Sequence, residues 1–153
     1  MVVQYVNGDI FINRFNAQAV AHGCNIQGVM GAGIAVQFKK RYPEMFKVYR
    51  QMCQEQCITV GDCFWWEEKD KPIVFNLMTQ PDCGGATYDG IRESLLEMRK
   101  IATKKPRITS IAMPKIGAGL GGLNWEIIKC LIEKVFDGWN GILYIYEEYI
   151  PNC

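Results

Sequence analysis

The sequence predicts an α/β fold with a mixed, mostly parallel central sheet flanked by helices. Apolar, β-branched runs alternate with helical patterns along the chain. Two glycine-rich segments, 23–33 and 117–122, each follow a strand pattern and precede a helical one. Because ligands of parallel sheets sit outside the carboxyl ends of the strands, both segments are expected to face one cleft. We expect one domain spanning residues 1–153, long enough to bury its own core.

The first half of the chain begins with a strand over residues 2–6, which should end at an Asn7-Gly8-Asp9 turn. A second strand over residues 19–21 leads into the first glycine-rich segment, and a helix follows to about Arg41. Pro43 disfavours helix at the residue before it and suits the first turn of a second helix. The inner face of that helix should carry Phe46, Tyr49 and Cys53.

The second half opens with a hairpin, in which strands 61–66 and 73–78 flank a charged turn. Thr87 should begin a helix with an apolar stripe of Ile91, Leu95, Met98 and Ile101. The remaining elements are a strand over 108–113, a helix over 124–136 and a final strand over 142–146.

The charge balance, the hydropathy and the cysteine content of the sequence argue against several classes of function. Seventeen basic and sixteen acidic residues leave no surplus that would bind nucleic acid strongly without specificity. No run of eighteen apolar residues and no signal-peptide pattern occurs, so we expect a cytoplasmic protein that does not bind membranes. We also expect a monomer. The seven cysteines include no Cys-x-x-Cys pair and stand with a single histidine, which favours reduced thiols over disulfides or zinc. We expect no cofactor and no metal.

The first glycine-rich segment is suited to holding an anion. Glycines permit positive φ and close backbone approach, so successive amide N–H groups can converge on a phosphate. Neither familiar phosphate motif is complete: Ile34 and Ala35 follow where a P-loop needs Lys-Ser/Thr, and Val36 replaces the third glycine of the dinucleotide fingerprint. A turn without a ligand therefore stays open, although two facing loops match a diphosphate. Cys24, inside the segment, is either a nucleophile or a packing residue.

Four motifs in this order resemble those of macro domains. They are Val6-Asn7-Gly8-Asp9-Ile10, His22-Gly23-Cys24-Asn25, Met30-Gly31-Ala32-Gly33-Ile34-Ala35 and the run from Met113 to Trp125. The resemblance spans nearly the whole chain and implies a three-layer α/β fold that binds ADP-ribose or an ADP-ribosylated substrate. Within the superfamily the chain is similar to terminal ADP-ribose protein glycohydrolases, DNA ADP-ribosyl glycohydrolase antitoxins and ADP-ribose 1''-phosphate phosphatases.

The resemblance also implies roles for individual residues. Asp9 and Ile10 are expected to contact adenine, although Asp9 can also cap its own turn. Tyr146 is expected to cover the ring, Asn25 to reach the distal ribose, and the two glycine-rich segments to enclose the ribose and diphosphate. The full ligand-binding set is Asp9, Ile10, Asn25, Met30, Gly31, Ala32, Gly33, Ile34, Thr79, Ile116, Gly117, Ala118, Gly119, Leu120, Gly121 and Tyr146.

The expected catalytic residues are His22, Asn25 and Asp82. In the glycohydrolases a lysine after the threonine of the fourth strand attacks the ribose and an aspartate in the second loop assists. Here Gln80 takes the place of the lysine, and Gly121 and Asn124 stand where the aspartate occurs. Glutamine forms no Schiff base, which argues against lysine-type chemistry. His22 matches the histidine implicated in the phosphatases, although a lone histidine at a strand end can also be structural.

Three functions therefore remain open. The first is an enzyme that removes a group from the terminal ribose of an ADP-ribose derivative, with ADP-ribose 1''-phosphate as the leading substrate. The second is a reader that binds ADP-ribose without turnover. The third is a structural α/β domain whose loops hold nothing. A metabolite, a modified protein and a modified nucleic acid all stay open as the substrate.

Overall fold

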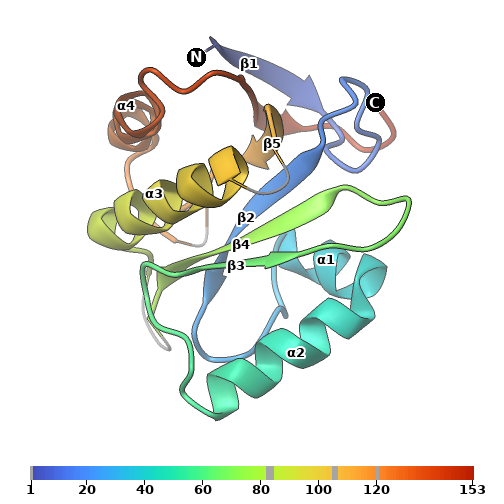
Figure 1. Cartoon of the computed structure of the whole chain (residues 1–153), viewed down its shortest axis with the longest axis vertical. Coiled ribbons are helices and arrows are strands. Elements are labelled where there is room, and N and C mark those ends of the chain that lie inside the picture. Colours follow the sequence, from blue (N-terminus) through green and yellow to red (C-terminus); the bar gives the residue numbers. More distant parts are fainter. Residues whose placement is uncertain (1, 82–84, 105–106, 120) are drawn as a thin grey trace.

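The computed structural model describes residues 2–81, 85–104, 107–119 and 121–153 (Figure 1). Within these ranges the chain forms six strands and four helices. They are β1 (Val2–Gly8), β2 (Ala19–Asn25), α1 (Ala35–Arg41), α2 (Pro43–Gln54), β3 (Cys63–Trp66), β4 (Ile73–Gln80), α3 (Tyr88–Lys104), β5 (Ser110–Pro114), α4 (Trp125–Val135) and β6 (Ile142–Tyr149).

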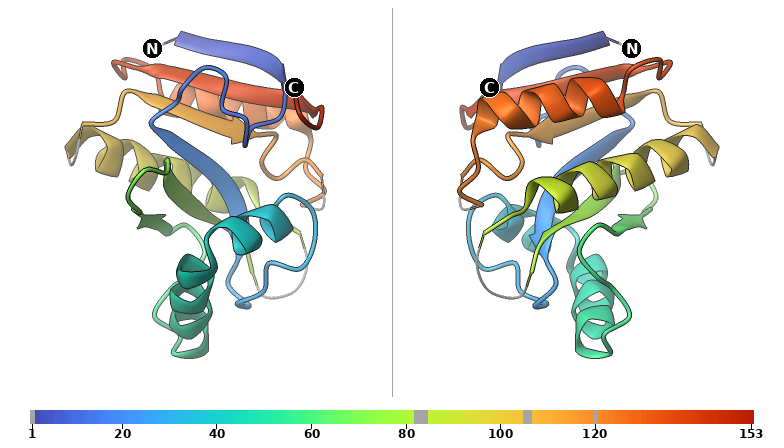
Figure 2. Two further views of the ribbon diagram at one scale, coloured as in Figure 1. Left: turned by 90° about the vertical axis from the view of Figure 1, so that its right-hand side faces the viewer. Right: turned by 90° about the vertical axis from the view of Figure 1, so that its left-hand side faces the viewer.

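The strands form one sheet in the order β1-β6-β5-β2-β4-β3. Neighbouring strands are parallel except β3, which runs antiparallel to β4 at one edge. The predicted α/β class and the predicted hairpin are therefore confirmed. Helices α1 and α2 cover one face of the sheet, and α3 and α4 cover the other (Figure 2).

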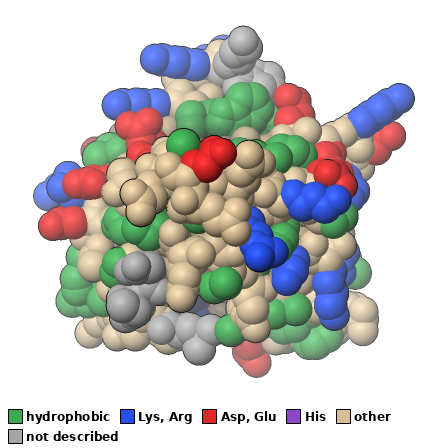
Figure 3. All heavy atoms as spheres, turned by 90° about the horizontal axis from the view of Figure 1, so that it is seen from below, with side chains coloured by type: hydrophobic (Ala, Val, Ile, Leu, Met, Phe, Trp, Pro, Cys, Tyr) green, Lys and Arg blue, Asp and Glu red, His purple; other side chains and the backbone are tan. Residues whose placement is uncertain are grey.

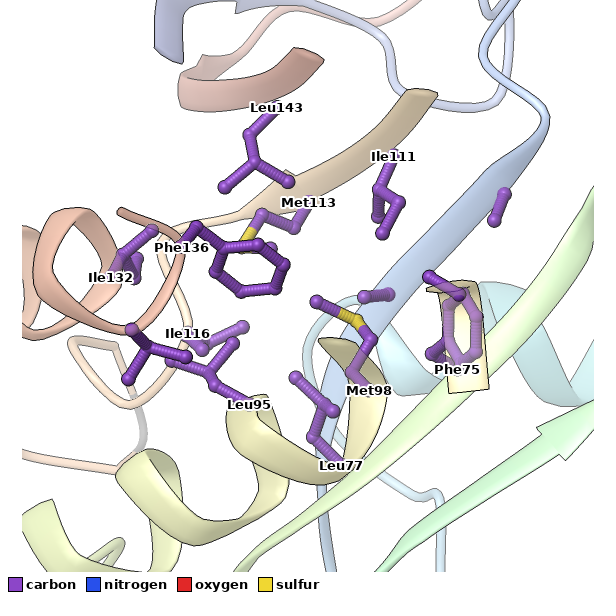
Figure 4. Packing of buried hydrophobic residues seen from close by; sticks show 14 of the residues in the cluster. Phe75, Leu77, Leu95, Met98, Ile111, Met113, Ile116, Ile132, Phe136 and Leu143 are labelled. Carbon is purple, nitrogen blue, oxygen red and sulfur yellow. The ribbon is translucent and has the colours of Figure 1, made fainter. Parts of the chain in front are cut away.

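Both faces of the sheet are apolar, as its two helical layers require. Along β4, Phe75 and Leu77 pack under α3 and α4, whereas Val74 and Met78 point toward α1 and α2. Figure 4 shows Phe75 and Leu77 beside Met98 of α3, in the core between the sheet and the helices. Alternation with a period of two along each strand thus assigns its side chains to two separate cores.

The predicted end of the first strand is wrong by two residues. Asn7 and Gly8 belong to β1, where a bulge after Val6 lets them pair with Glu148 and Tyr149. The final strand is longer than predicted for the same reason, since β6 continues to Tyr149 along the extended β1. The turn follows instead at Ile10–Ile12, where the Ile12 N–H donates to the carbonyl oxygen of Asp9 over 3.0 Å.

Helix boundaries lie close to those predicted. The Thr87 hydroxyl accepts from the Gly90 N–H over 3.0 Å at the start of α3, and the Asn124 side chain accepts from Glu126 N over 2.9 Å at the start of α4. Asn124 is therefore the N-cap rather than the first helical residue. The strand predicted over 108–113 begins only at Ser110, because the Ile108 N–H closes the end of α3 by donating to the Ala102 carbonyl.

Helix α2 begins at Pro43, as predicted, but its inner face differs. Tyr49 is fully buried, whereas Phe46 and Cys53 are only half-buried. Met45, which the sequence prediction omitted, is buried with Tyr49. In the described ranges, no helix combines the length and the apolar character that crossing a bilayer requires.

Candidate functional site

A cavity of about 470 Å³ opens at the carboxyl ends of the central strands. Its walls come from the segments after β2, β4 and β5, so the two glycine-rich segments face each other across it, as predicted. Its described lining residues are Gly23, Cys24, Asn25, Val29, Met30, Gly31, Ala32, Gly33, Ile34, Ala35, Thr79, Gln80, Pro114, Lys115, Ile116, Gly117, Gly119 and Gly121. A cavity of this size is typical of sites for nucleotide-sized ligands.

Asn25 organises the first glycine-rich segment. Its Oδ1 accepts from Gln27 N over 3.0 Å and from the Tyr49 hydroxyl over 2.8 Å, and its Nδ2 donates to the Val29 carbonyl over 3.1 Å. The Tyr49 hydroxyl lies equally close, at 2.8 Å, to the Asn25 backbone carbonyl oxygen, and its single proton serves one of these acceptors at a time. One amide N–H of Asn25 remains for a ligand. The structure therefore gives Asn25 a loop-holding role beside any contact with a ribose.

The second glycine-rich segment packs against the residues that lead into α3. The Ala86 N–H donates to the Gly121 carbonyl over 3.0 Å, and the Leu123 N–H donates to the Gly117 carbonyl over 2.9 Å. Gly117 has φ +74°, and a Cβ there would lie 2.5 Å from the Ile91 side chain. The positive φ strongly favours glycine, and a Cβ would also force the Ile91 side chain to move, which explains one of the loop glycines without reference to a ligand.

Gly31 and Gly119 have a different explanation. Both line the cavity, one in each segment, and a Cβ built at either would meet no heavy atom within 4 Å. Neither backbone adopts the left-handed conformation, so the fold itself does not require glycine there. Both positions are exposed and border open space, so glycine at each leaves the two walls of the cavity free of side chains.

The described lining is almost entirely uncharged. Its polar side chains are the neutral Asn25, Thr79 and Gln80, and Lys115 is the one charged group. The surface seen from below carries basic and acidic side chains in mixture, and neither sign covers that face alone (Figure 3). Within the described ranges, no group of three His, Cys, Asp or Glu side chains could hold a metal ion.

His22 does not line the cavity. Its side chain is fully buried, its ring stacks on Phe38 at 3.9 Å, and its Nε2 lies 2.6 Å from Asn76 Oδ1. The Asn76 amide nitrogen donates to the Phe64 carbonyl, so Oδ1 is the acceptor and His22 Nε2 carries the proton. Burial lowers the pKa of His22 to about 4, so the ring is neutral at physiological pH. This geometry matches a structural histidine.

Cys24 lines the cavity but lacks the features of a nucleophile. Its Sγ lies 3.5 Å from His22 Nε2, the nitrogen that already donates to Asn76. Burial raises the pKa of the Cys24 thiol well above its usual value, so the thiolate is disfavoured. The six cysteines in the described part of the chain are all free thiols.

The residues expected around adenine lie outside this cavity. Asp9 is 6% exposed; its Oδ1 accepts from Phe11 N over 2.9 Å, and its Oδ2 accepts from Asn152 N over 3.1 Å. The carboxylate thus caps its own turn and also holds the C-terminal segment. Tyr146 is buried nearby, and its hydroxyl has no hydrogen-bond partner among the described residues.

Most of the predicted binding residues do meet at the cavity. Those that line it are Asn25, Met30, Gly31, Ala32, Gly33, Ile34, Thr79, Ile116, Gly117, Gly119 and Gly121. Those that do not are Asp9, Ile10, Ala118, Tyr146 and the catalytic candidate His22. Asp82 and Leu120 lie outside the described residues.

Several lining residues were absent from the predicted set, namely Gly23, Cys24, Val29, Ala35, Gln80, Pro114 and Lys115. Each lies within two positions of a predicted residue in the sequence. All of them lie at the end of a strand or in a strand-to-helix loop. A prediction that took every residue at these places as lining the cleft would have included them.

The family model described as "Macro domain" matches residues 21–131. The chain is a macro domain. The match begins in β2 and ends in α4, so it contains both segments that wall the cavity.

Two kinds of curated relative resemble this macro domain at full length. Human "ADP-ribose glycohydrolase OARD1" is 30% identical over 145 residues, covering 94% of the chain and 90% of the relative. "ADP-ribose 1''-phosphate phosphatase" of Candida albicans is 28% identical over 156 residues, covering 94% and 99%.

Other relatives are longer. "DNA ADP-ribosyl glycohydrolase" of Mycobacterium tuberculosis is 32% identical over 139 residues, which are 88% of the chain but only 39% of that relative. The chain thus spans about two fifths of its length. The solved macrodomain of Mycobacterium tuberculosis DarG superimposes with a TM-score of 0.85 at 30% identity and covers 99% of both chains.

Proposed function

We propose that this macro domain binds ADP-ribose in the cleft and hydrolyses a substituent from the terminal ribose. The observation that carries the proposal is the pair of glycine-rich segments facing each other across one cavity of about 470 Å³. Segments with small or absent side chains let backbone N–H groups approach a diphosphate closely. The names of the glycohydrolase and phosphatase relatives support a hydrolase that acts on ADP-ribose derivatives.

ADP-ribose 1''-phosphate is the substrate we favour. Gln80 lines the cavity at the position where the glycohydrolase resemblance expects a nucleophilic lysine. A carboxamide is no nucleophile and forms no Schiff base, so removal of a glycosidic group by that route is disfavoured. Hydrolysis of a phosphate ester by water needs no amine, and the similarity to a phosphatase from Candida albicans agrees with this choice.

The acid–base group for such a reaction has one remaining candidate. His22 is buried on the α1 side of the sheet and does not line the cavity, so we do not include it in the reaction. Asp82 follows Gln80 by two residues and remains the carboxylate that the sequence offers. We therefore expect Asp82→Asn to lose turnover while keeping ADP-ribose affinity.

A reader without turnover is the second candidate. The observation that favours it is the absence of any carboxylate or imidazole among the described lining residues. Such a cleft can bind a diphosphate through neutral groups and backbone amides, but it has little means of moving protons.

One assay series separates the two candidates. ADP-ribose is titrated calorimetrically into the purified protein, and the same sample is incubated with ADP-ribose 1''-phosphate while phosphate release is followed. Binding with release that Asp82→Asn abolishes supports the phosphatase. Binding without release from this substrate, an ADP-ribosylated protein or ADP-ribosylated DNA supports the reader. Absence of binding contradicts both.

A further inference from the structure

We propose that Lys115 is the charge-selecting residue of the cleft, whose ammonium group contacts a phosphate of the bound ligand and ties affinity to the ligand's negative charge. This inference rests on the proposed function, because it takes an ADP-ribose type of diphosphate as the occupant of the cavity. It adds a specific side-chain contact to a site otherwise built from backbone and neutral groups.

Lys115 differs in charge from the other described residues that line the cavity. Among the described lining residues it is the one charged side chain, and no carboxylate accompanies it. A diphosphate brings two negative charges, and Lys115 is the positive side chain that the described lining offers to them. A lysine ammonium is a compact point charge that suits phosphate oxygens without a fixed geometry.

Backbone hydrogen bonds fix the position of Lys115 at the edge of the sheet. Lys115 follows directly on Pro114, the last residue of β5, which pairs with Tyr146 of β6. The Ile116 N–H donates to the Pro114 carbonyl over 2.9 Å, and the Ala118 N–H donates to the Lys115 carbonyl over 3.4 Å. The side chain therefore leaves a hydrogen-bonded turn at the carboxyl edge of the sheet, and it is exposed.

The ammonium group of Lys115 forms no ion pair and no hydrogen bond with any other described residue. The pKa of one carboxylate, that of Glu147, is lowered mainly by the hydrogen bonds that Trp125 and Lys129 donate to it. The charge of Lys115 has a small effect on this carboxylate, whose pKa it lowers slightly. Glu147 Oε2 lies 2.9 Å from Trp125 Nε1 and 3.2 Å from Lys129 Nζ. Its carboxylate is thus held by two other groups, which leaves Lys115 available to a ligand.

The size of the effect follows from exposure. An exposed charge pair is weakened by solvent and by salt, so removal of Lys115 should cost about three- to tenfold in affinity rather than abolish binding. Salt screens such pairs strongly once the Debye length falls to a few ångströms, at about 1 M ionic strength. The loss should therefore be large in dilute buffer and small in concentrated salt.

The test is calorimetric titration of ADP-ribose into wild type, Lys115→Gln and Lys115→Arg, at about 0.05 M and about 1 M salt. Lys47→Gln is the matched control, because Lys47 is an exposed lysine of α2 that pairs with Glu44 over 3.0 Å and does not line the cavity. We expect Lys115→Gln to weaken binding about three- to tenfold at low salt and much less at high salt. Lys115→Arg and Lys47→Gln should bind like wild type.

Two results would overturn the inference while leaving the proposed function intact. One is wild-type affinity in Lys115→Gln at low salt. The other is an equal loss in Lys47→Gln, which would reveal a general effect of net charge. Wild-type protein that gives no binding heat with ADP-ribose would instead overturn the proposed function, and this inference with it.

Discussion

The buried histidine makes the stability of this protein depend on pH in a way that can be calculated. His22 is the chain's only histidine, and burial lowers its pKa from 6.5 to about 4 in the folded state. Between pH 6.5 and pH 4, His22 is therefore protonated in the unfolded chain but neutral in the folded chain. The contribution is favourable above pH 6.5 and is lost as the pH falls toward 4.

The magnitude follows from the two pKa values. Between pH 7.5 and pH 5, the free energy of unfolding should fall by about 2 kcal/mol through His22 alone. For a domain of this length, that loss corresponds to a melting temperature lower by about 4–8 °C. Carboxylates titrate mainly below this range, so the window isolates the histidine.

The assay is urea unfolding of wild type and His22→Gln at several pH values between 7.5 and 5. Glutamine can still donate to Asn76 Oδ1 but does not titrate. The free energy of unfolding of His22→Gln should therefore lack the decrease of about 2 kcal/mol between pH 7.5 and pH 5. NMR titration of the single imidazole in wild type gives an independent midpoint, which should lie near 4. An imidazole midpoint near 6.5, or equal pH dependence in both proteins, would refute the structural role assigned to His22.

Three further predictions concern the cleft and its surroundings. Gly31→Val should lower ADP-ribose affinity at least tenfold by calorimetry, because Gly31 lines the cavity and a Cβ there meets no atom within 4 Å. Denaturant unfolding of the same variant checks that its fold is retained. Unchanged affinity would show that this wall does not touch the ligand. Asp9→Ala should cost about 1–3 kcal/mol in denaturant unfolding, because the N–H groups of Phe11 and Asn152 lose their acceptor; wild-type stability would contradict that. Turnover should persist in EDTA, because the proposed hydrolysis by water with Asp82 as the acid–base group uses no metal ion; a loss that a divalent ion restores would contradict this.

The sequence was sufficient to predict the order of elements and the cleft. Alternating strand and helix patterns predict a mostly parallel sheet, and the topology then brings both glycine-rich segments to one edge. Gly31 and Gly119 line the same cavity, although 88 positions separate them in the sequence. The alternation of strand and helix patterns, together with the rule that ligands bind at the carboxyl ends of parallel strands, was enough to predict the cleft.

The environments of His22 and Asp9 were harder to predict. The period of two in β2 assigns His22 to the same face as Val20 and Cys24, but its stacking on Phe38 depends on how α1 packs. Asp9 was expected to contact a ligand, and the motif gave no sign that its carboxylate also accepts from Asn152, 143 residues away in the sequence. Both contacts are tertiary, and no local propensity encodes them.

The central claim, that the cleft between the two glycine-rich segments binds ADP-ribose, is tested most directly by calorimetric titration of ADP-ribose into wild type and Gly119→Val. Gly119 lies in the second glycine-rich segment and lines the cavity, and a Cβ there meets no atom within 4 Å. Denaturant unfolding of the variant is measured alongside to show that it folds. We predict one binding site per wild-type chain and affinity at least tenfold weaker in the variant. Absence of binding to wild type, or equal binding to both proteins, would contradict the claim.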